Sequence, residues 1–128
     1  MEYLAAVDAV IKEVRDPHLP DGVVIRDGLA LVLCGWRLNT SAAYDRAWDV
    51  LGTAAQEALA EFHHLPPVTY LVDPAADQTS VWTRTGWLVG AIAERLDRIA
   101  TDDLSDAARA WQLATSAARL RTALPEPI

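Results

Sequence analysis

The sequence predicts an α+β fold, in which a small antiparallel sheet of two to four strands packs against about four helices. Two observations favour this class. Apolar residues recur at helical spacing in several segments, and an Asp27-Gly28 pair lies between two apolar runs, as in a two-residue β-hairpin. If residues 22–36 form a buried helix instead, the alternative is an all-α bundle of four or five helices. The length of 128 residues predicts a single domain, residues 1–128.

The first element is an amphipathic helix over residues 2–15. Its apolar stripe consists of Leu4, Val7, Val10, Ile11 and Val14. Asp16-Pro17 ends this helix, because a proline disfavours helical backbone at the residue before it. Residues 16–22, which contain a second proline, are therefore a connecting loop.

Residues 23–38 are predicted to form two antiparallel strands. Asp-Gly suits the type I′ turn of a short hairpin, because both central residues of that turn need a positive φ angle. A helix over the same residues would contain Gly28 and Gly35, and each glycine would weaken it by about 1 kcal/mol.

A long helix follows, which any of the good N-cap residues Asn39-Thr40-Ser41 can begin and which ends at Leu65-Pro66-Pro67. Its apolar stripe consists of Tyr44, Trp48, Leu51, Ala55, Ala58, Leu59 and Phe62. The β-favouring residues 68–72 that follow the helix are predicted to form a third short strand.

Two further helices complete the chain. Residues 77–80 can cap a helix that continues to about residue 100, although residues 79–85 alternatively form a fourth strand with the helix starting near Gly86. The last helix extends from Ser105 to about Thr122. Its wide apolar face consists of Trp111, Leu113, Ala114, Ala117, Ala118 and Leu120.

Composition excludes several classes of function. Eighteen acidic and eleven basic residues give a net charge of −7, which disfavours nucleic acid and anionic membrane surfaces as partners. The sequence shows no signal peptide and no apolar run long enough to cross a membrane, so we expect a cytoplasmic protein. Cys34 lies inside an apolar run and is expected to be a buried, inert thiol.

No complete catalytic or metal-binding set is recognised, and we expect neither a metal nor a cofactor. Glu61 and His64 have the spacing of two metal ligands on one helical face, but there is no second pair of this kind. Glu57, Glu61 and the pair Glu94-x-x-Asp97 are similar to the acidic helices of all-α nucleotide pyrophosphatases. That family's doubled glutamate is absent because residue 56 is Gln, so no family is assigned.

Five tryptophans are the conspicuous enrichment in this sequence. Trp48 and Trp111 lie on predicted core stripes, whereas Trp87 lies at the border of its helix's apolar face and is expected to be half exposed. Trp36 and Trp82 lie at predicted element ends, where a ligand cleft or an interface edge can form, although core packing is the favoured interpretation for both. The small residues Gly86 and Gly90 are expected to allow close packing within the chain.

These features predict a non-enzymatic interaction or regulatory protein that forms a homodimer through a surface including Trp87. The alternative is a small-molecule-binding domain, or a small enzyme, with a tryptophan-lined pocket for an apolar or aromatic ligand. The candidate binding residues are Trp36, Trp82, Trp87, Arg84, His18 and Asp73.

Overall fold

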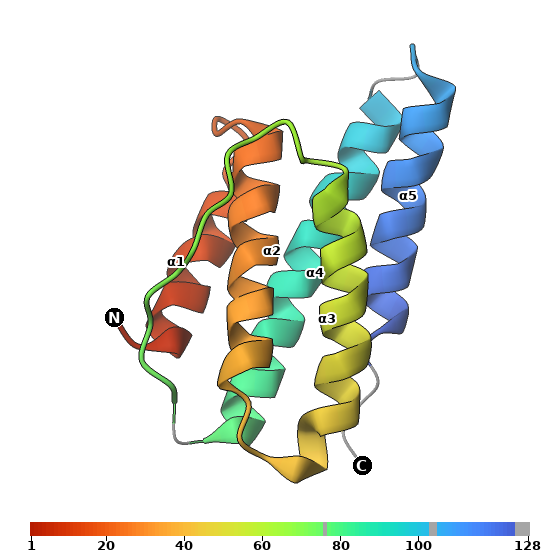
Figure 1. The fold of residues 1–128 in the computed structure, drawn as a ribbon. Helices are drawn as coiled ribbons and strands as arrows, with labels where there is room; N and C mark the ends of the chain where they lie inside the picture. Colours follow the sequence, from red (N-terminus) through yellow and green to blue (C-terminus); the bar gives the residue numbers. More distant parts are fainter. Residues whose placement is uncertain (76, 103–104, 125–128) are drawn as a thin grey trace.

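The computed structural model describes residues 1–75, 77–102 and 105–124, which form five α-helices and no β-sheet (Figure 1). The helices are α1 (Tyr3–Arg15), α2 (Asp21–Leu38), α3 (Asp45–Ala60), α4 (Gln78–Asp102) and α5 (Ala107–Thr122), with a 3-10 turn at Ala42–Tyr44 before α3. The predicted α+β class is therefore wrong. The alternative, an all-α bundle, describes the fold.

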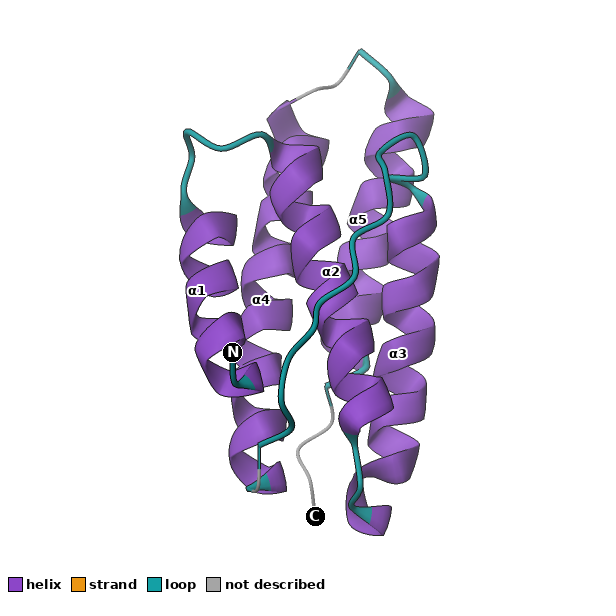
Figure 2. Cartoon of the chain, turned by 60° about the vertical axis from the view of Figure 1, so that its left-hand side comes forward, coloured by secondary structure: helices purple, strands orange, loops and turns teal. Residues whose placement is uncertain are grey.

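The helices lie side by side along one direction, and the connection between α3 and α4 sets the topology. Neighbours in the order α1, α2, α3 are antiparallel, and so are α4 and α5 (Figures 1 and 2). Between α3 and α4 the chain returns along the outside of α1 and α2, so that α3 and α4 are parallel. We call residues 61–75 of this connection the crossover segment.

The predicted hairpin over residues 23–38 is wrong, because these residues form the continuous helix α2. No described glycine has a positive φ angle, so Asp27-Gly28 does not form a type I′ turn. Gly28 instead faces the core, where an added Cβ would lie 2.7 Å from the Ile92 side chain. Gly35 similarly faces the Tyr3 hydroxyl and the Trp48 ring. Both glycines allow α2 to approach its neighbours closely, and that packing outweighs their low helix propensity.

The other predicted strands are not part of a sheet either. Residues 68–72 lie in the crossover segment and form no strand. The backbone pairing in this segment is at Asp73: the Tyr3 N–H donates to the Asp73 carbonyl (3.0 Å), and the Asp73 N–H donates to the Met1 carbonyl (2.9 Å). Residues 79–85 belong to the first turns of α4. Asp77 caps this helix, because its carboxylate accepts the backbone N–H groups of Thr79 and Ser80.

The apolar stripes of α1 and α3 agree with the sequence predictions, although α3 begins at Asp45 after the predicted caps and ends at Ala60, before Leu65. The phase of α5 does not agree. Trp48 of α3 is buried as expected, whereas Trp111 of α5 is 70% exposed, so its predicted core position is wrong. The buried stripe of α5 consists of Leu113, Ala117 and Leu120. Trp111 precedes Leu113 by two residues, or about 200° around the helix, and therefore faces away from the core.

The core lies between the five helices and contains mainly aliphatic side chains. Its largest completely buried apolar members are Trp48, Tyr3, Ile25, Leu29, Leu31, Leu51, Leu88, Ile92, Leu96 and Leu120. No helix formed by the described residues is long and apolar enough to cross a membrane.

Candidate functional site

An open groove between α1 and α4 contains the exposed indole of Trp87. The groove has a volume of about 540 Å³ and is lined by Asp8, Ile11, Lys12 and Arg15 of α1 together with Trp87 of α4. The spacing of these α1 residues places them on one stripe of the helix, beside α4. Trp87 is 56% exposed, as the sequence predicted.

Arg84 holds the Trp87 ring at the edge of this groove. The two residues are three positions apart on α4, and the guanidinium carbon of Arg84 lies 5.4 Å from the centroid of the Trp87 ring. Nη1 of Arg84 also donates to both carboxylate oxygens of Asp8, each at 2.7 Å. Asp8, Arg84 and Trp87 therefore form one chain of contacts from α1 to the exposed indole.

The groove carries a local surplus of positive charge. Asp8 is paired with Arg84, whereas Lys12 and Arg15 form no ion pair with any described residue. The molecule as a whole has a net charge of −7. Two unpaired cations beside an exposed tryptophan therefore distinguish this face from an otherwise acidic protein.

The other two candidate tryptophans lie elsewhere. Trp82 is buried and packs edge-to-face on Trp48, with ring centroids 5.2 Å apart. Trp36 is half-buried between α2 and α3, where its indole N–H donates to Asp49 (2.9 Å) and its ring lies against Gly52. The structure thus brings Arg84 to Trp87 but does not bring the three tryptophans into one pocket.

His18 and Asp73 are not brought to the groove. His18 is exposed in the loop after α1, where its backbone N–H donates to Asp16, whereas Asp73 pairs with the chain just before and at the start of α1. The 13 residues of α1 separate these two positions by about 20 Å. A joint site of His18, Asp73 and Arg84 is therefore not formed.

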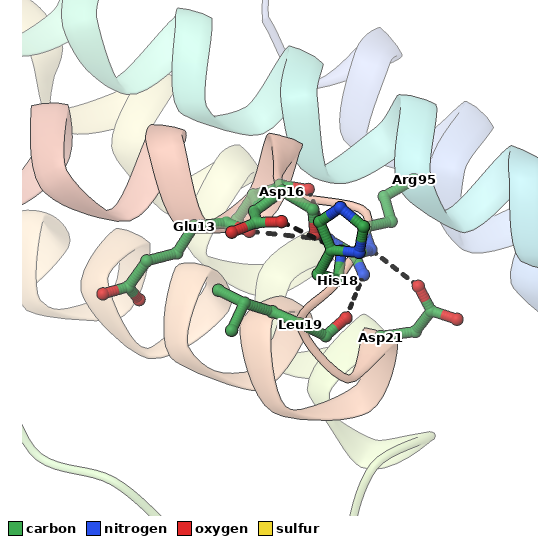
Figure 3. A network of polar contacts seen from close by, with 7 residues as sticks. Glu13, Asp16, His18, Leu19, Asp21 and Arg95 are labelled. Carbon is green, nitrogen blue, oxygen red and sulfur yellow. Dashed lines mark hydrogen bonds and ion pairs between the residues drawn. The ribbon is translucent and has the colours of Figure 1, made fainter.

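Arg95 is the polar side chain that the sequence analysis missed. It is 2% exposed, and Figure 3 shows its guanidinium directed at the loop between α1 and α2. It donates to the carbonyls of Val14 and Asp16 (2.8 Å each) and of Leu19, and its Nε donates to Asp21 (2.7 Å). The signal in the sequence was the position of Arg95, three residues after Ile92 and one before Leu96, on the buried stripe of α4.

Three of the acidic residues named in the sequence analysis, Glu57, Glu61 and Asp97, are used in contacts to α5. Glu57 pairs with Arg119 (3.1 Å), Glu61 pairs with Arg109 (3.7 Å), and Asp97 pairs with Arg121. Within the described parts of the chain, no group of three or more His, Cys, Asp or Glu residues is placed to hold a metal ion.

Cys34 is buried in α2 under the crossover segment. Its Sγ donates a weak hydrogen bond to the Tyr70 carbonyl (3.9 Å), and burial raises the pKa of the thiol above its ordinary value. A raised pKa lowers the thiolate fraction near neutral pH, which opposes a role as a nucleophile.

Comparison with protein-family models, curated proteins and solved structures finds no match. The functional assignment therefore depends on the geometry of this chain.

Proposed function

We propose that this chain is a non-enzymatic interaction protein, and that a second copy of the chain binds at the α1–α4 groove to form a homodimer. The observation that carries the proposal is the exposed Trp87 indole, held in place by Arg84 beside two unpaired cations. An ordered, exposed indole is typical of interface hot spots, because little conformational entropy is lost when it is buried.

The energy available from Trp87 is large enough for association. With 56% of the residue exposed, each copy has on the order of 100 Å² of indole surface left to bury. At about 25 cal/mol per Å², this burial contributes roughly 2.5 kcal/mol per copy before ordering costs. A two-fold dimer uses the same patch on both subunits, so this contribution counts twice.

The charges around Trp87 also suit a self-complementary surface. Glu94 follows Trp87 by seven residues on α4, which places it on the same face, and it is exposed without an ion pair to any described residue. Lys12 and Arg15 carry the opposite charge on the neighbouring helix. In a two-fold arrangement, the cations of one copy face Glu94 of the other.

The test compares Trp87→Glu with Trp111→Glu by sedimentation velocity over a range of protein concentrations. Both tryptophans are exposed helical residues, but only Trp87 lines the groove, so Trp111→Glu is a matched control for charge and lost indole. We expect Trp87→Glu to raise the dimer Kd at least about 100-fold, and Trp111→Glu to leave it unchanged.

Three outcomes contradict the proposal. A wild-type protein that stays monomeric at high concentration excludes self-association. A dimer that dissociates with Trp111→Glu rather than Trp87→Glu places the interface on α5. A Trp87→Glu variant that unfolds, as judged by circular dichroism, shows that the indole stabilises the monomer instead.

A further inference from the structure

A second groove, separate from Trp87, lies between α2, α3 and the first part of the crossover segment. One part has a volume of about 360 Å³, and the adjoining part, at the carboxyl-terminal end of α2, has about 290 Å³. The two parts meet at Gln56 of α3, and their α2 linings, Ala30 and Leu33, are one helical turn apart; we call the two parts together the α2–α3 groove. These volumes are at the lower end of the range for small-molecule sites.

The floor of this groove is apolar along its length. Its aliphatic and aromatic lining includes Ala30, Leu33, Trp36, Leu59, Leu65 and Val68. Trp36 is fixed by its hydrogen bond to Asp49 and by its packing on Gly52, so the ring is a preformed part of the wall. An apolar ligand would bury surface here without ordering a mobile side chain.

The two arginines at the groove differ in whether they have an anionic partner. Arg26 donates to the Asp27 carboxylate and, through Nη1, to the Pro66 carbonyl (3.1 Å), so its charge and its geometry are already satisfied. Arg37 lines the other end and is exposed; it contacts the neutral thiol of Cys34 but forms no ion pair with any described residue. Apart from Arg26 and Arg37, the described lining carries only neutral polar groups and His63.

We propose that the α2–α3 groove binds a free amphipathic anion, namely a single aliphatic chain that ends in a carboxylate. The aliphatic chain of the ligand lies on the apolar floor, and its carboxylate binds the guanidinium of Arg37. An arginine presents planar donors that match a carboxylate, and one without a carboxylate partner among the described residues, at the end of an apolar groove, selects an anion over a neutral or cationic head group. This site does not depend on Trp87 or on self-association.

Isothermal titration calorimetry of the full chain with octanoate, nonanoate and decanoate tests the apolar contact, below the concentrations at which these compounds form micelles. We expect the Kd to fall up to about fourfold for each added methylene group. Decanol and decyltrimethylammonium, which have the same chain, are expected to bind at least about tenfold more weakly than decanoate.

Two pairs of variants localise the site. Arg37→Glu should weaken decanoate binding at least about tenfold, whereas Arg46→Glu, an exposed arginine of α3 outside the groove, should not. Gln56→Trp fills the point at which the two parts meet and should abolish binding, whereas Gln112→Trp on α5 should not. If Gln56→Trp fails to fold, the arginine pair decides the question.

Several results would overturn this inference: no binding of decanoate, no dependence on chain length, equal binding of decanol, or equal effects of Arg37→Glu and Arg46→Glu. If the protein sediments with anionic phosphatidylglycerol vesicles but does not bind decanoate, the partner of this groove is a membrane surface rather than a free anion. Trp87→Glu should bind decanoate normally, so a failure of the dimer proposal does not affect this result.

Discussion

Arg95 shows how one buried charge can organise a helix end. The last carbonyls of α1 have no helical partners. The guanidinium of Arg95 donates hydrogen bonds to the carbonyls of Val14 and Asp16, and also to the carbonyl of Leu19 in the loop. Asp21 at the start of α2 supplies the opposite charge. A single side chain of α4 thus holds together the end of α1, the loop and the start of α2.

Replacing Arg95 with Met should therefore destabilise the fold. The substitution leaves the carbonyls of Val14 and Asp16 without donors in the interior, and we expect the free energy of unfolding in urea to fall by about 3 kcal/mol or more. Arg95→Lys should not restore it, because an ammonium group cannot reach the same divergent set of acceptors.

Arg98→Met is the matched control for this prediction. Arg98 lies one turn further along α4 and is exposed, so its replacement should change the free energy of unfolding by no more than about 0.5 kcal/mol. Equal effects of the two substitutions would show that the buried network contributes no particular stability.

At the scale of the helices, the glycines of α3 and α4 lie in two different environments. Gly52 of α3 lies under the Trp36 ring, and a Cβ at this position would overlap the ring atoms. Gly86 and Gly90 of α4 were expected to pack closely against another part of the chain, but an added Cβ at either would meet no described atom within 4 Å beyond its chain neighbours and the adjacent backbone of α4. That expectation is wrong, so these two glycines lower helix propensity without allowing a close contact within the chain.

Alanine substitutions at these positions should therefore change the free energy of unfolding in opposite directions. Gly86→Ala and Gly90→Ala should each raise the free energy of unfolding by up to about 1 kcal/mol, because alanine favours the helix. Gly52→Ala should lower it by about 1–3 kcal/mol, because the indole of Trp36 must move away from Asp49. Urea denaturation midpoints measure all three, and a stabilising Gly52→Ala would contradict the assigned packing of Trp36.

At the scale of the whole molecule, the crossover segment is a long connection whose described residues form no helix or sheet. It is attached to α2 through the Pro66 and Tyr70 carbonyls and to the start of α1 through Asp73. Half-buried side chains such as Val68, Tyr70 and Val72 alternate with the exposed Thr69 and Leu71. This alternation gave the strand prediction, but here it reflects an extended chain that packs on helices.

The segment should separate from the bundle at alkaline pH. Burial, followed by the nearby carboxylates of Asp27 and Glu13, raises the pKa of Tyr70 from 10.0 to about 12. Because the folded-state pKa exceeds the unfolded value, this contribution to stability is complete below pH 10 and is lost as the pH rises from 10 to 12. Circular dichroism and urea denaturation across this range should show a decline that Tyr70→Phe reduces. An identical decline in Tyr70→Phe would exclude Tyr70 as its cause.

Local patterns predicted much of the secondary structure and one half of the candidate site. The apolar stripes of α1 and α3 depend on nearby residues alone, and the phase of α4 placed Trp87 at its exposed border. Arg84 was named as a binding residue, and its position three residues before Trp87 is also local. The α1 half of the groove was not predicted, because nothing local indicates that α1 packs beside α4.

The sequence by itself determined that this chain forms amphipathic helices around one core and leaves Trp87 exposed. The tertiary structure alone decided that Gly28 is a packing contact rather than a turn residue, because its neighbour Ile92 lies 64 positions away in the chain. It likewise decided that Arg95 is buried and that Trp111 is not. In each case the side chain's environment consists of residues distant in sequence, and a local pattern contains no information about those partners.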